Sequence, residues 1–155
     1  MEIELLTEFC KSVRHSTIKR LELVPEGYEN WRVSSGALSF AETAKHLIDL
    51  DNWLFQKIKD PDTKSIETET AIIKHCSRKE YIELITNLKE VLEKKIDLIN
   101  TMDEDKLKVK IYDDAYNSEV SLAWLILRRN IDHEIHHRGQ IAVYLRVLKD
   151  KKVIV

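Results

Sequence analysis

Four segments of the chain repeat apolar residues at intervals of three and four positions, which is the spacing of one face of an α-helix. They cover about residues 2–23, 39–60, 77–99 and 121–149. A helix of about 20 residues is roughly 30 Å long, and amphipathic helices of similar length bury their apolar faces best side by side. The pattern therefore predicts an all-α protein, a four-helix bundle formed by a single domain that spans residues 1–155.

Three of the four expected helices have a recognisable start. Ser39 is followed by Glu42, and Ser77 is followed by Glu80, each pair at the spacing of a capping box. In a capping box each side chain accepts a hydrogen bond from a free backbone N–H group of the other residue. Ser121 is the expected cap of the last helix.

The segments 60–76 and 102–118 are polar and weakly periodic, so we expect loops there. Residues 71–73 and 108–111 are each compatible with a short strand. Connections of about 15 residues are long for a minimal bundle. They leave room for crossovers or for loops that cover one end of the bundle.

The composition excludes several classes of protein. Only 3 glycines and 2 prolines occur in 155 residues, which is too few for turn-rich sandwiches or barrels. Charged residues make up 34% of the chain but the net charge is −2, so we expect no nucleic acid as a partner. No apolar run is long enough to span a membrane, and the acidic N-terminus does not resemble a signal peptide. With only 2 cysteines, the expected location is the cytoplasm.

The last helix interrupts its apolar pattern with polar residues. Asn130, His133, His137 and Tyr144 occupy positions on its inner face, and His46 does the same on the second helix. Residues four apart on a helix have Cβ atoms about 5–6 Å apart, so two imidazoles so placed can reach one metal ion. If the two helices pack together, three histidines converge. Three neutral imidazoles and a water molecule form an open metal site.

A single histidine on an apolar face is more often a packed core residue than a ligand, but three at these positions favour a divalent metal ion. Nitrogen ligands suit zinc, nickel or copper better than magnesium or calcium, and zinc or nickel is the ion we expect. His136 lies to one side of the inner face. It is the obvious substitute for His137 in the triad.

The run from His133 to His137 also matches H-E-x-x-H, the zinc-protease helix in which the glutamate is the general base. Those enzymes take their third ligand from downstream. No histidine or glutamate follows His137, and Val143 stands where a metzincin has its third histidine. A histidine from an upstream helix serves better, so we do not favour a protease.

Other features carry less information. Cys10 and Cys76 lack a metal-binding spacing and are interpreted as core or surface residues. Arg128, Arg129 and Arg138 make the last helix basic. Ion pairs across the bundle are the favoured interpretation, and an anionic substrate or a dimer face is the alternative. Three glycines cannot build a glycine-rich phosphate loop.

The chain resembles the DinB family in three places. Residues 132–141, DHEIHHRGQI, followed by Tyr144-Leu145-Arg146, are similar to the final helix of that family. Residues 39–47, SFAETAKHL, are similar to its second helix, and the approach through Val24-Pro25-Glu26 and Trp31-Arg32 is similar to its linker. The resemblance covers nearly the whole chain in the same order. Its most specific part is the run His-x-x-x-His-Arg-Gly-Gln.

This resemblance implies a four-helix bundle that is a metal-dependent enzyme, with a triad that matches His46, His133 and His137. It also implies a homodimer. Several relatives, among them YfiT-like thiol transferases, use a low-molecular-weight thiol, and the family name records induction by DNA damage.

Three hypotheses follow, and the first two belong to different classes of function. The first is a cytoplasmic metal-dependent enzyme, either a thiol-dependent S-transferase or a hydrolase, that acts on a small molecule. The second is a non-catalytic metal-binding or stress-related interaction protein that acts as a homodimer. A bundle whose histidines are merely packed is the third and weakest. Metal-bound imidazoles commonly donate their other N–H to a neighbour, and the candidates for this role are His136, Glu134, Asn130, Gln140 and Asp49.

Overall fold

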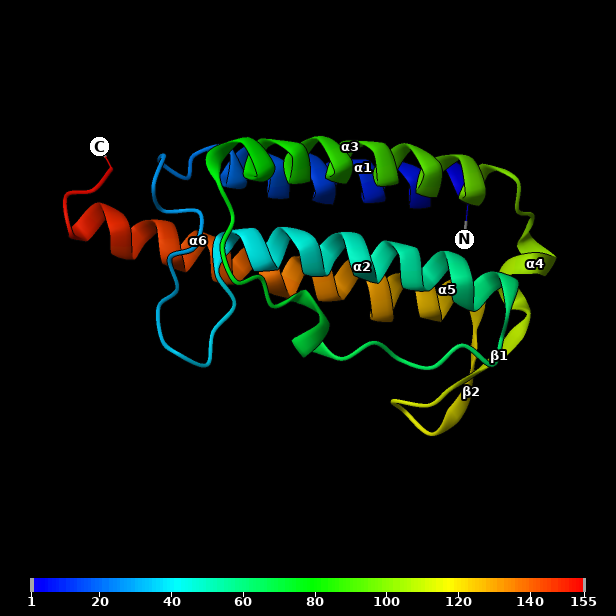
Figure 1. Ribbon diagram of the computed structural model, residues 1–155. Coiled ribbons are helices and arrows are strands. Elements are labelled where there is room, and N and C mark those ends of the chain that lie inside the picture. The colour runs from blue at the N-terminus through cyan, green and yellow to red at the C-terminus, as the bar shows by residue number, and fades with distance from the viewer. Residues whose placement is uncertain (1, 155) are drawn as a thin grey trace.

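The computed structural model describes residues 2–154, apart from the side chains of residues 68 and 69. Four long helical stretches lie along one another, with α1 and α3 on one side and α2 and the last stretch on the other (Figure 1). Their bounds are α1 Ile3–Leu21, α2 Phe40–Lys59, α3 Arg78–Asn100 and, within the last stretch, α5 Leu122–Trp124, η2 Leu125–Ile131 and α6 Asp132–Asp150. The predicted all-α bundle is confirmed.

Both predicted capping boxes are present. The hydroxyl of Ser39 accepts a hydrogen bond from the N–H of Glu42 at 3.1 Å, and the Glu42 carboxylate accepts one from the N–H of Ser39 at 2.8 Å. Ser77 and Glu80 pair in the same way at 3.3 and 2.7 Å. Ser121 caps the first turn of α5 with its hydroxyl. Each cap fixes where its helix begins, and therefore in which direction the later side chains point.

The last helical stretch is not a regular α-helix along its whole length. Residues Leu125–Ile131 form a π-helix, η2, between the α-helical turns of α5 and α6. Such inserts are rare and occur frequently at functional sites. The apolar spacing predicted one continuous helix, because a spacing of three and four residues does not distinguish a short π-helical insert from α-helix.

The connections differ from the expectation. Residues 71–73 form no strand, and the 3-10 helix η1, Thr68–Ala71, ends there instead. The second predicted strand starts two residues late, because α4, Glu104–Lys108, takes its first residue. Strand β1, Lys110–Asp113, pairs antiparallel with β2, Ser118–Ser121. Within residues 2–154 these two strands form the one sheet, so residues 71–73 have no partner strand.

Two apolar clusters fill the interior of the bundle, and buried polar residues separate them. Along α1, Leu6 belongs to one cluster and Leu21 to the other, while Arg14 lies between them with 1% of its surface exposed. All of the long helices contribute buried polar residues at this level. We call the following set the polar layer: Arg14, Asp51, Lys95, Asn130 and Glu134.

Two basic residues of the last helical stretch are engaged in ion pairs. Arg128 pairs with Asp132, and Arg129 pairs with Asp113 of β1 at 2.9 Å. The Arg129 guanidinium also lies over the ring of Trp53, 5.0 Å from its centroid. The contact of Arg129 with another element supports the interpretation of ion pairs across the bundle, whereas Arg128 pairs within its own helical stretch. None of the described helices is both long and apolar enough to cross a membrane.

The cap of α3 provides a first prediction. Ser77→Ala should lower the free energy of unfolding by about 1 kcal/mol, because the N–H of Glu80 loses its acceptor. Urea denaturation followed by circular dichroism measures this difference. Thr86→Ala is the matched control, because Thr86 is exposed within the same helix and alanine has the higher helix propensity. An equal loss in both variants would contradict the assigned cap.

Candidate metal centre

His46 lies on the face of α2 that is turned toward the last helical stretch. The capping box starts α2 at Phe40, and the inward face then carries Thr43, His46 and Leu50, all buried. The His46 side chain is 2% exposed. The sequence pattern placed His46 on this face, and the structure confirms the placement.

His133 and His137 lie one turn apart on α6 and point toward His46. The Nε2 atom of His133 is 2.9 Å from Nε2 of His46 and 3.0 Å from Nε2 of His137. One ring nitrogen from each of the three residues lies within 4.8 Å of the others. The structure therefore brings together the three predicted histidines, and the exposed His136 is outside this cluster.

The donor set fits a metal ion better than it fits hydrogen bonding alone. An uncharged imidazole nitrogen either carries one proton or offers one lone pair, so Nε2 of His133 cannot form good hydrogen bonds with both neighbours at once. A cation removes this conflict because it accepts a lone pair from each ring. Bonds of about 2.0–2.1 Å suit zinc and imidazole. Nitrogens 2.9 and 3.0 Å apart are close enough to share one such ion.

The three rings are uncharged at neutral pH. Burial, with a smaller contribution from neighbouring imidazoles, lowers the pKa of His46, His133 and His137 from the ordinary 6.5 to about 4. Metal binding requires the neutral form of histidine. The cluster therefore offers lone pairs at pH 7 with no proton to displace.

Gln140 fixes the tautomer of one ring. Nδ1 of His137 lies 2.9 Å from the Gln140 carbonyl oxygen, which can only accept, so Nδ1 carries the proton and Nε2 presents its lone pair to the cluster. The Gln140 amide nitrogen donates to Nε2 of His136 at 3.1 Å. Among the described residues, the one buried side-chain polar atom without a partner is Nδ1 of His46. No protein group therefore selects the tautomer of that ring.

The remaining candidate neighbours serve elsewhere. Glu134 is 2% exposed and accepts two hydrogen bonds from Arg14 at 2.7 and 2.9 Å. Its carboxylate is therefore occupied, which counts further against the protease interpretation. Asn130 hydrogen bonds to Asp51, and Asp49 pairs with Lys45. Of the five predicted neighbours, Gln140 is the one that hydrogen bonds to a triad member.

The cysteines take no part in the site. Cys10 and Cys76 are both free and buried. Burial raises the pKa of the Cys10 thiol to about 11 and raises that of Cys76 as well. Both thiols are therefore protonated at neutral pH, which agrees with their interpretation as packed residues.

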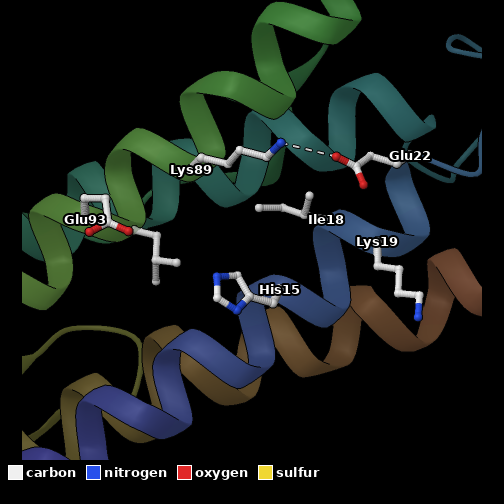
Figure 2. A pocket seen from close by; sticks show the side chains of 7 residues that line it. His15, Ile18, Lys19, Glu22, Lys89 and Glu93 are labelled. Atoms are coloured by element: carbon white, nitrogen blue, oxygen red, sulfur yellow. Dashed lines mark hydrogen bonds and ion pairs between the residues drawn. The ribbon is translucent and has the colours of Figure 1, made fainter.

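Of the cavities along the described residues, the two of greatest volume lie near the helices, and neither is lined by a member of the triad. A cavity of about 490 Å³ lies between α1 and α3. Lys89 and Glu22, which line it, form an ion pair at 3.2 Å (Figure 2). A second cavity of about 400 Å³ is lined by Lys45 and Asp49, which flank His46 along α2. This cavity is not predictable from the sequence, because the loop residues that complete it share no motif.

The fold is that of known DinB-like structures. A DinB-like protein, YjoA, from Bacillus subtilis is 21% identical and superimposes with a TM-score of 0.70, covering 94% of this chain and 92% of the other. An uncharacterised protein from Clostridium difficile 630 is 13% identical with a TM-score of 0.71, covering 96% and 98%. At these identities the likeness concerns the fold alone. No curated protein is significantly similar to the chain.

The family assignment rests on the sequence as well as the fold. The model of the DinB family matches residues 2–153, which include the helices that carry all three histidines. The chain therefore belongs to the DinB family.

Proposed function

We propose that the protein is a divalent-metal-dependent enzyme in which His46, His133 and His137 hold the ion. The observation that carries this proposal is the convergence of three uncharged imidazoles from α2 and α6 within 4.8 Å. An ion held there lowers the pKa of a bound water or thiol and so supplies a nucleophile near neutral pH. Zinc and nickel suit the nitrogen donors best.

The number of ligands supports an enzyme over a structural site. Structural zinc sites use four protein ligands, whereas catalytic sites use three and keep one position for water or substrate. Across residues 2–154, no carboxylate or thiol joins the histidine cluster. The triad thus supplies the three protein ligands of an open catalytic site and lacks the fourth ligand of a structural site.

The proposed substrate is a small molecule, and the reaction is a thiol-dependent S-transfer or a hydrolysis. Family membership supports the use of a low-molecular-weight thiol. The 400 Å³ cavity lined by Lys45 and Asp49 is in the size range of small-ligand pockets, and no member of the triad lines it. The proposal also includes a homodimer in the cytoplasm and no role for nucleic acid or a membrane.

One observation favours the non-catalytic alternative. Gln140 is the polar neighbour of the triad, and an amide does not transfer protons. The two acidic residues that adjoin His133 are both paired, Glu134 with Arg14 and Asp132 with Arg128. A metal-binding or stress-related interaction protein would need no general base. The turnover experiment below decides between the two functions.

Metal content tests the site directly. Protein purified without a histidine tag should contain about one divalent ion per chain, and the triple variant His46→Ala, His133→Ala, His137→Ala should contain none. The chain offers a matched control, because its other three histidines, His15, His75 and His136, lie outside the cluster. Their triple replacement by alanine should keep the metal. Equal metal by elemental analysis in all three proteins would reject the site.

The contact of Gln140 with Nδ1 of His137 predicts a role for Gln140 in metal binding. Gln140→Ala should weaken zinc or nickel binding by about tenfold, since neighbours of metal ligands contribute 10–100-fold to affinity. Gln140→Glu keeps an acceptor for Nδ1 of His137 and should retain the affinity. Competition with a chromogenic chelator measures the dissociation constants. His136→Ala removes the other partner of Gln140 and should have little effect; a larger loss there would assign the role to His136.

Turnover separates the enzyme from the binder. Metal-loaded protein, incubated with cysteine or glutathione and 1-chloro-2,4-dinitrobenzene, should form the thioether faster than the thiol alone. A chelator or the triad variant should abolish the acceleration, because no ion is then held. Absence of turnover with thiols, esters and amides, in protein shown to carry metal, would favour the non-catalytic function.

A further inference from the structure

The polar layer links all of the long helices through one hydrogen-bonded network. Arg14 of α1 donates to both carboxylate oxygens of Glu134 at 2.7 and 2.9 Å, and to Asp51 of α2 at 2.8 Å. Lys95 of α3 donates to Asp51 at 2.8 Å and to Asn130 at 2.9 Å. Asn130 in turn donates to Asp51 at 2.9 Å. Every member is 2% exposed or less.

Stability alone does not account for this network. Desolvating four charged groups costs several kcal/mol each, and apolar residues of similar volume are often as stable or more so. The network avoids a further penalty because no side-chain atom of these residues is both buried and without a partner. What it offers beyond apolar packing is direction, since the Arg14–Glu134 pair is bidentate and forms in one relative orientation.

The network holds the same two helices that carry the triad. Asn130 and Glu134 bracket His133 on the last helical stretch, and Asp51 lies little more than one turn beyond His46 on α2. Rotating α6 by one residue, about 100°, would move Glu134 away from Arg14. The same rotation would move His133 away from His46.

We propose that Arg14 and Glu134 are positioning residues, which fix the rotation of α6 so that the imidazoles of His133 and His137 meet that of His46. This role rests on the proposed metal function. Neither residue touches the ion or the substrate. Arg14 and Glu134 form their ion pair inside the bundle, whereas the three imidazoles meet where α2 contacts α6.

The test replaces the pair as a unit. The double variant Arg14→Met, Glu134→Met removes one positive and one negative charge. Lys95 and Asn130 keep their bonds to Oδ1 of Asp51, whereas Oδ2 of Asp51 and the carbonyl of Leu88 lose their bonds from Arg14. The variant should fold, with a melting temperature similar to or below that of the wild type. Zinc affinity should fall by at least about tenfold. In metal-free protein, NMR contacts between ring protons of His46 and His133, whose ring centroids are 5.1 Å apart, should weaken or disappear.

Two further variants keep the result interpretable. Arg14→Lys retains the charge but cannot form the bidentate pair, so it should show a smaller loss of zinc affinity and of the ring contacts. It serves as the test if the double variant does not fold. Tyr81→Phe removes a buried hydrogen bond from α3 to the carbonyl of Leu21 on α1. That bond involves neither α2 nor α6, so the variant should leave the affinity and the ring contacts unchanged.

The ring contacts need no metal, so this inference and the proposed function can fail separately. Persisting contacts in the folded double variant, or zinc affinity within threefold of the wild type, would overturn the positioning role. If the wild type binds no metal but the contacts vanish in the double variant, the positioning role stands and the metal function falls. A loss of affinity in Tyr81→Phe equal to that in the double variant would also overturn it, because general destabilisation would then explain both.

Discussion

The contact between α2 and the last helical stretch is the constraint on which the rest of the structure depends. On its inner side the contact is made by Asp51 with Asn130 and, through Arg14, with Glu134. On its outer side it is made by three imidazoles. Burying charges is favourable only with complete pairing, so the inner contacts accept very few relative positions of the two helices. That restriction is what a site made from two separate helices requires.

Much of the fold is predictable because its signals are local. The capping boxes at Ser39 and Ser77 and the apolar spacing depend on residues within one or two turns of one another. They therefore appear in the sequence without knowledge of the tertiary structure. The predicted strand at 71–73 failed for the opposite reason. A strand needs a partner, and three consecutive apolar residues do not say whether one is near.

The candidate site was predictable in part for the same reason. His133 and His137 are four residues apart on one helix, and His46 lies on an apolar face. Choosing His137 over His136 needed only the direction of the inner face. The contact of Gln140 with His137 was harder to predict from the sequence, because it depends on the rotamers of both side chains. The π-helix required tertiary information, since nothing in residues 125–131 alone marks it.

The polar layer was missed although it left a signal. Arg14, Asp51 and Lys95 each stand on the apolar face of a helix, close to the level at which one apolar cluster ends and the other begins. One charged residue on such a face is commonly a side chain that reaches solvent with its charged end. Three charged residues of mixed sign at the same level of three helices do not fit that explanation, because they can pair with one another inside the bundle. Such a set predicts a buried network of ion pairs.

The charge balance of the interior bears on what the proposed centre can do. Within the polar layer two basic and two acidic side chains are paired, and the three imidazoles are uncharged at neutral pH. Neither group neutralises a divalent ion at the triad. The full charge of the ion would then act on whatever occupies its remaining positions, and it stabilises an anion there more strongly than a centre with carboxylate ligands does. A nucleophile that must lose a proton to react, such as a thiol or water, is the kind of ligand this favours. Because the opposite charges of the polar layer are paired with each other, the layer can orient the histidines without offsetting that charge.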